Sequence, residues 1–222
     1  GKPNKSKKSC LTNSKGFFNN VNTHFINYSM GRINVEEIYE ESKSQVEILL
    51  SNGFNITHFD SHQNVHILPP FFEAINKLRK EFLPKSFIRI PYENLRMPFI
   101  YKLSNLRRIL ILNLFSIYVK KKIGTKNSVQ TIGGDFYNNQ YSQEVFQRIL
   151  NNLLVDKHSE FEIAVHPGFF SNDILIYDSY SYNREIELQF LTNSREFIDK
   201  HNIRIVSFSD LIYENTEMKC KI

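Results

Sequence analysis

Hydrophobic residues recur along this chain at two spacings, one typical of amphipathic helices and one of short buried strands. Asn34, with Glu37 three residues later, fits a helix cap, and Gly53 is a typical helix stop. Pro70 suits the first turn of a second helix. The predicted helices cover residues 34–52, 70–82, 101–122, 142–154 and 184–201.

Short apolar runs between these helices predict buried strands at residues 56–60, 87–91, 128–136, 161–165 and 203–208. The polar segment from Lys2 to Arg32 is predicted to be a loop region, and the tail from Glu214 to be loose. Alternation of strands and helices is typical of parallel α/β folds. We therefore expect one domain over residues 1–222, with a (β/α) barrel-like fold, a distorted TIM-type barrel.

Composition narrows the choice of partners. The 28 basic and 23 acidic residues leave a net charge of +5, and they form no basic face with interleaved aromatics, so we expect no nucleic-acid partner. The longest apolar stretch, Ile109 to Val119, is too short for a bilayer, so we expect no membrane partner. Cys10 and Cys220 suggest no disulfide framework, which favours a cytoplasmic protein. A homodimer is left open.

The most informative stretch is Ile56 to Pro70, which holds three of the seven histidines and one aspartate. If residues 56–62 are extended, His58, Asp60 and His62 project from the same face. Imidazole and carboxylate are common ligands of catalytic divalent ions, so this pattern indicates a metal site. The alternative is a set of structural histidines bonded to backbone. The site would lie after the carboxyl end of a strand, where parallel α/β folds bind ligands.

Two other strand ends carry candidate residues. Arg89 stands alone in an apolar strand and needs a partner, either Glu93 or another carboxylate, or it orients the site or substrate. His166 follows the strand at 161–165, and Pro167 and Gly168 fix the turn there. If the strands are parallel, His166 can reach the same pocket as His62. The alternative for His166 is a turn histidine bonded to backbone.

These segments carry a resemblance to a known family. The sequence THFDSHQNVHILP at residues 57–69 resembles the signature of the YdjC-like carbohydrate deacetylases, which include chitooligosaccharide deacetylases. Segments 87–91 with Glu93, 162–168, and 181–192 resemble later parts of the same family in the same order. The resemblance covers nearly the whole chain.

The resemblance implies hydrolysis of the N-acetyl group of an acetylated amino sugar or oligosaccharide, with Mg²⁺ or Zn²⁺ as cofactor. It implies that His62 is a metal ligand, that Asp60 orients an imidazole, and that His166 is the general acid. Imidazole suits that role because its pKa lies near neutrality. Arg89 and Gly168 are expected to bind or orient substrate, and His58 and His66 to be neighbours rather than ligands.

Part of the family pattern is not in this sequence. The family has an early strand ending in paired aspartates and then a metal histidine before its GKP-like segment, whereas this chain starts at Gly1-Lys2-Pro3. We therefore expect a fragment that lacks the first unit or units of the barrel, or a degenerate relative that binds carbohydrate without catalysis. A metal-dependent esterase or phosphoesterase is a further alternative.

Overall fold

The computed structural model describes residues 1–4, 9–92, 106–124, 128–133, 144, 147, 149–151, 160–175 and 181–217. The chain divides into two compact units, each with a hydrophobic cluster of its own. Unit 1 comprises Gly1–Ile90, Leu114–Ser128 and Ser207–Ile222; unit 2 comprises Pro91–Asn113 and Val129–Val206. That the two units form one domain stays a prediction.

Unit 1 begins with two capped helices, α1 (Val21–Ser29) and α2 (Val35–Ser51). The Asn20 side chain accepts a hydrogen bond from the Thr23 backbone, and Asn34 accepts from Glu36 and Glu37, so both caps satisfy amides that the helix leaves open. Helix α2 confirms the predicted helix. The prediction of loop over residues 2–32 is wrong at α1.

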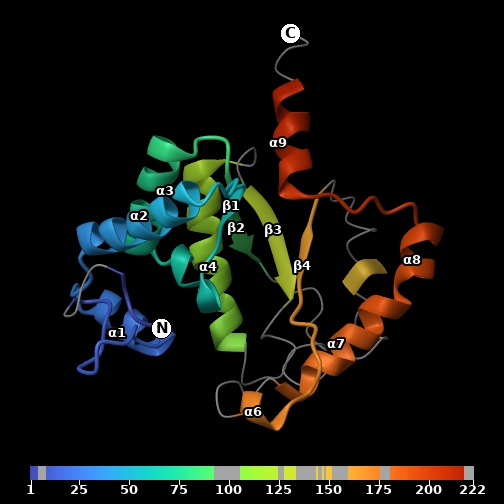
Figure 1. The fold of residues 1–222 in the computed structure, drawn as a ribbon, viewed down its shortest axis with the longest axis horizontal. Helices are drawn as coiled ribbons and strands as arrows, with labels where there is room; N and C mark the ends of the chain where they lie inside the picture. The colour runs from blue at the N-terminus through green and yellow to red at the C-terminus, as the bar shows by residue number, and fades with distance from the viewer. Residues whose placement is uncertain are drawn as a thin grey trace. The chain divides into compact units, whose positions relative to one another are not determined.

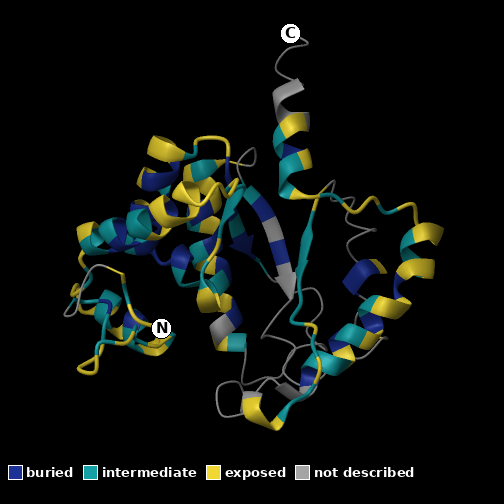
Figure 2. Ribbon diagram, in the orientation of Figure 1, coloured by how far each residue is buried: buried dark blue, intermediate teal, exposed yellow. Residues whose placement is uncertain are grey.

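A parallel strand pair with a connecting helix forms the rest of the unit 1 core. Strand β1 (His58–Phe59) leads into the 3-10 helix η1 (His62–Ile67), helix α3 (Pro69–Phe82) and strand β2 (Phe87–Pro91). His58 pairs with Phe87 and Phe59 with Ile88. Helix α3 packs along α2 (Figure 1), and its buried residues alternate with exposed ones (Figure 2). The hydrophobic cluster of unit 1 comprises the buried residues Leu11, Ile38, Tyr39, Val46, Leu68, Phe71, Ala74 and Leu78.

Two further helices complete unit 1. The second half of α4 (Leu106–Ile123) brings Phe115 edge-on against Phe25 and Tyr28 of α1. Helix α9 (Phe208–Glu217) places Phe208 on the rings of His58 and Phe87. The predicted strand at residues 203–208 is wrong, because residues 203–207 form no strand and Phe208 begins a helix. The loose tail is wrong as far as Glu217 for the same reason; residues 218–222 lie outside the described residues.

Unit 2 contains a second parallel strand pair, β3 (Ser128–Gly133) and β4 (Glu162–Ala164), in which Thr131 pairs with Glu162. The short helix α6 (Asn172–Leu175) follows, then α7 (Ser181–Asn193) and α8 (Arg195–Lys200). The predicted helix at 184–201 is thus two helices, divided at Ser194, whose hydroxyl donates to the Leu191 carbonyl. The cluster of unit 2 comprises Ile109, Ile149, Leu150 and Phe190.

Parallel pairing in both units confirms the α/β class. A closed barrel is not shown by the described part of the chain, so the barrel stays a prediction. The predicted helix at 142–154 lies largely outside the described residues, as do residues 101–105 and 134–136 of two other predicted elements. Among the helices that can be described, none is both long and apolar enough to cross a bilayer.

Candidate functional site

The loop after β1 is shaped by a tight reversal at the start of η1. Gln63 and Asn64 adopt positive φ angles of 55° and 58°, which the small polar side chain of asparagine tolerates better than most. This reversal turns His66 inward while His62 stays exposed. The two histidines of one short segment therefore meet different environments.

His66 is a structural histidine. Its Nε2 lies 2.8 Å from the Arg89 carbonyl oxygen and so donates to it, and its Nδ1 lies 2.9 Å from the Ser61 hydroxyl. Ser61 Oγ also accepts the His66 backbone N–H at 2.8 Å. Burial lowers the pKa of His66, and the nearby Asp60 carboxylate offsets part of this effect. Both ring nitrogens are engaged, and that His66 is a neighbour rather than a ligand stays a prediction.

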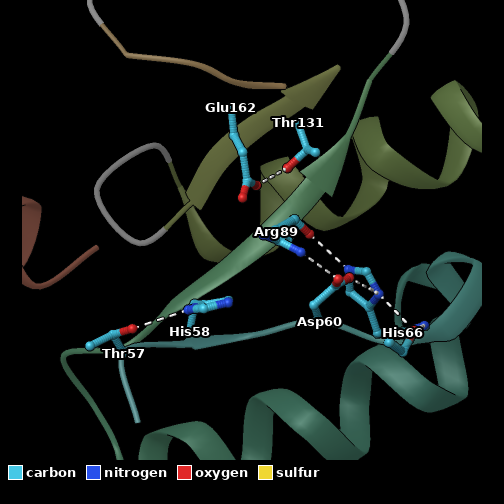
Figure 3. A network of polar contacts seen from close by, with 8 residues as sticks. Thr57, His58, Asp60, His66, Arg89, Thr131 and Glu162 are labelled. Carbon is cyan, nitrogen blue, oxygen red and sulfur yellow. Dashed lines mark hydrogen bonds and ion pairs between the residues drawn. The ribbon is translucent and has the colours of Figure 1, made fainter. Parts of the chain in front are cut away.

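Asp60 and Arg89 form an ion pair at the mouth of this loop (Figure 3). Arg89 Nη1 lies 2.6 Å from Asp60 Oδ2, and Asp60 Oδ1 lies 3.6 Å from His66 Nδ1. Asp60 thus lies near the imidazole of His66, and its role in orienting an imidazole at a metal site stays a prediction. The pair also gives Arg89 a carboxylate partner across the strands; Glu93, the other candidate, lies outside the described residues.

A cavity of about 690 Å³ within unit 1 opens beside this loop. Asp60, His62 and His66 line it together with residues from the N-terminal segment, α1, α2 and α3. His58 is not among the lining residues; it stacks on Phe208 with ring centroids 4.3 Å apart, and its Nδ1 lies 3.1 Å from the Thr57 hydroxyl. The predicted alternation therefore brings Asp60 and His62, but not His58, to one cavity.

His24 is a lining residue of this cavity that the sequence did not single out. It is 5% exposed and meets the Phe71 ring edge-on at 5.1 Å. Burial lowers the pKa of His24, partly offset by a hydrogen bond with the Asn19 backbone. A histidine on a polar segment that was predicted to be a loop gave no signal of burial.

The described residues do not form a complete metal site. No group of three or more His, Cys, Asp or Glu side chains that could hold an ion is found in the described ranges. His66 is engaged through both ring nitrogens and Asp60 is paired with Arg89, which leaves His62 as the candidate donor of this loop. These residues alone do not fit a divalent ion.

In unit 2, the loop that carries His166 is held by the first turns of α7. The Glu187 carboxylate accepts the His166 backbone N–H, and Arg184 Nη1 donates to the His166 carbonyl at 3.3 Å. The Gly168 amide donates to the Arg184 carbonyl at 3.2 Å, and Glu185 Oε1 accepts from the Phe170 amide at 2.9 Å. A Cβ at Gly168 would lie 3.7 Å from Arg184 Cδ, an ordinary van der Waals distance, so the turn packs beside α7 here without excluding a side chain.

The imidazole of His166 is half-exposed, whereas Glu187 is fully buried beneath it. A second polar contact of this unit joins its strands: Thr131 Oγ1 on β3 donates to Glu162 Oε2 on β4 at 2.8 Å (Figure 3). His62 belongs to unit 1 and His166 to unit 2, so their convergence on one pocket stays a prediction.

Comparison with known proteins identifies the family. A family model described as YdjC-like protein matches residues 1–199. The chain belongs to the YdjC-like family.

Curated relatives of this YdjC-like chain carry consistent names. A carbohydrate deacetylase of Clostridium beijerinckii is 30% identical over 181 residues, which cover 80% of this chain and 62% of that protein. A carbohydrate deacetylase of Brevibacillus brevis is 26% identical over 90% of this chain and 70% of its own length. A chitooligosaccharide deacetylase of Yersinia enterocolitica is 26% identical over 81% of this chain and 63% of its own. The chain thus spans about two thirds of the length of these relatives.

Glu187 of the YdjC-like chain is a second residue that sequence reasoning missed. The segment 181–192 that resembles the family includes this carboxylate, but the resemblance gave it no role. Its signal was a charged residue within the buried positions of α7, because a buried carboxylate requires donors.

Proposed function

We propose that the protein to which this chain belongs is an enzyme that removes N-acetyl groups from acetylated amino sugars or oligosaccharides. Membership of the YdjC-like family carries the proposal, and the names of the curated relatives support it. The cavity beside β1 adds support, because it offers both polar and aromatic side chains, as small-molecule binding sites do.

In this proposal, His62 contributes one ligand to a divalent ion, Mg²⁺ or Zn²⁺. Its exposure at the cavity supports this role, since the ring is not committed to the core as His66 is. The described residues hold no group of three donors, so the proposed ion would need at least one ligand from elsewhere. Asp60 lines the cavity and is paired with Arg89, and in the proposal this pair holds the shape of the loop and orients the substrate.

His166 is proposed as the general acid that protonates the departing nitrogen. Its half-exposed ring and its anchored backbone support the role, because a proton donor must be both accessible and fixed. The Gly168 amide holds the turn to α7 through the Arg184 carbonyl, and in the proposal Gly168 helps to bind or orient the substrate. The acetylated carbohydrate is the partner.

A non-catalytic carbohydrate-binding protein is the second candidate. The incomplete donor set among the described side chains favours it, because such a relative would keep the cavity without the ion. Acetate release from N-acetylated chitooligosaccharides by the full-length protein, with and without a chelator, separates the two. Release that the chelator abolishes supports the deacetylase; sugar binding without release supports the second candidate. Phosphate release from generic esters instead would indicate a phosphoesterase.

The ligand assignment has its own test. His62→Ala in the full-length protein should abolish bound metal and leave the fold intact, because an exposed loop side chain contributes little to the core. Elemental analysis of the purified protein measures this, with His58→Ala as the control that should retain the ion. Unchanged metal content in His62→Ala would move the assignment to another residue.

A further inference from the structure

The starting point is a carboxylate with an unusual environment for its charge. The side chain of Glu187 on α7 is completely buried, and burial of a carboxylate is costly unless donors compensate it. One compensating donor is the backbone N–H of His166. The same carboxylate oxygen, Oε2, lies 4.0 Å from Nδ1 of the His166 ring. Glu187 therefore accepts a hydrogen bond from the backbone of the proposed general acid and lies beside its imidazole, beyond hydrogen-bonding distance.

The His166 ring is partly exposed, but its Nδ1 atom is not. Nδ1 is buried, whereas the side chain as a whole is 40% exposed. The buried Nδ1 thus lies on the Glu187 side of the ring, 4.0 Å from the carboxylate. A carboxylate beside Nδ1 favours a proton on that nitrogen, as in other carboxylate–histidine pairs.

We infer that Glu187 is a positioning residue that holds the His166 proton on Nδ1 and so makes Nε2 the nitrogen that delivers a proton to the leaving amine. The inference rests on the proposed function. In that step the Nε2–H bond of the imidazolium breaks, an N–H bond forms on the departing nitrogen, and the electron pair of the broken C–N bond stays with that nitrogen. His166 is left neutral, with its remaining proton on Nδ1 beside Glu187.

A purely structural role for Glu187 is the competing explanation, and the chain offers a matched control for it. Glu185 lies on the same helix and anchors the same loop through the Phe170 amide, whereas Glu187 Oε2 also faces the imidazole. Arg184, the other charged residue at this turn, donates to the His166 carbonyl oxygen. If anchoring is all that matters, loss of either carboxylate should have similar consequences.

The first test compares Glu187→Gln with Glu185→Gln in the full-length protein. The glutamine at 187 keeps an acceptor for the His166 amide but removes the charge beside Nδ1. We expect kcat for acetate release to fall roughly 10- to 100-fold, the usual range for losing a group that orients a functional histidine, with KM within about twofold. Glu185→Gln should keep kcat within about twofold of the unsubstituted protein. Equal effects of the two substitutions, or a KM effect without a kcat effect, would overturn the inference.

The second test needs neither turnover nor a variant at position 187. Nitrogen-15 NMR of histidine-labelled full-length protein, with the His166 signals assigned by their loss in His166→Gln, reports which ring nitrogen carries the proton. We expect the neutral ring to be the Nδ1–H tautomer. An Nε2–H tautomer would refute the inference even if the protein is a deacetylase. Absence of deacetylase activity with the Nδ1–H tautomer present would instead refute the proposed function and retain the Glu187–His166 pairing.

Discussion

The loop at residues 60–66 of unit 1 and the loop at 166–170 of unit 2 both follow a parallel strand and both carry histidine, yet they are held in opposite ways. In the first, a buried histidine is itself the anchor, through Ser61 and the Arg89 carbonyl. In the second, charged side chains of α7 anchor the backbone and leave the histidine ring half-exposed. A histidine whose ring nitrogens anchor its own loop is unavailable for chemistry. A histidine that is anchored through its backbone keeps its ring available.

The largest effect is expected on turnover, from substitution of His166. His166→Ala should reduce turnover roughly 10²- to 10⁴-fold, the range for a lost acid–base group. Bound metal and the free energy of unfolding should hardly change, because the anchoring bonds of this loop involve the His166 backbone and not its ring. Acetate release, metal analysis and urea unfolding of the full-length protein measure the three quantities. An unaltered rate would remove His166 from the mechanism.

Substitution of His66, whose ring anchors its loop, should instead lower the free energy of unfolding. His66→Ala deletes a buried ring and leaves the Arg89 carbonyl and the Ser61 hydroxyl without their partners, so we expect the free energy of unfolding to fall by about 2–5 kcal/mol. His62→Ala, four residues earlier and exposed, is the control and should cost less than about 0.5 kcal/mol. Equal stabilities of the two variants would contradict the division between the histidines.

The free energy of unfolding should also depend on pH, because His24 and His66 are both buried. Burial lowers the pKa of both His24 and His66 in the folded state, so below about pH 6.5 the unfolded chain binds protons that the folded chain excludes. Stability is therefore complete above that pH and declines as the pH falls below it, with a slope of at most about 1.4 kcal/mol per pH unit for each histidine. Urea unfolding at several pH values between 7.5 and 5 measures the slope, and His24→Phe should reduce it. A slope unchanged in that variant would mean that His24 is protonated in the folded protein.

Sequence reasoning succeeded where local signals act alone. The strand Phe87–Pro91 was predicted with its observed bounds, and α3 within one residue of its start, because apolar spacing and proline chemistry are local. The strand predicted at 203–208 failed although a local signal was present: the Ser207 hydroxyl accepts from the Asp210 amide while Asp210 accepts from Ser207, a capping box that starts α9. The apolar run at 203–208 and the cap at Ser207 thus indicate different structures, and the cap is the one that the chain follows.

The site was less predictable, because its decisive contacts join residues far apart in the chain. Arg89 was known to need a carboxylate, but its partner Asp60 lies 29 residues away and belongs to the histidine motif. Glu187 meets His166 across 21 residues. The spacing of His62 and His66 within one motif could not reveal which ring is buried, since the reversal at Gln63 and Asn64 decides it.

The smallest expected effect concerns the ion pair that borders the first loop. Asp60→Asn should lower the free energy of unfolding by less than about 1 kcal/mol, because both side chains are partly exposed and solvent screens the pair. Its effect should still exceed that of Asp199→Asn, which breaks the more exposed Arg195–Asp199 pair on α8. The Asp60 variant also removes the carboxylate near His66. Its loss of stability should therefore persist in part at 1 M salt, where the Debye length of about 3 Å screens interactions between exposed charges. If salt cancels the cost of both variants equally, Asp60 is a surface charge with no part in the packing of His66, and the first loop is held by its neutral hydrogen bonds alone.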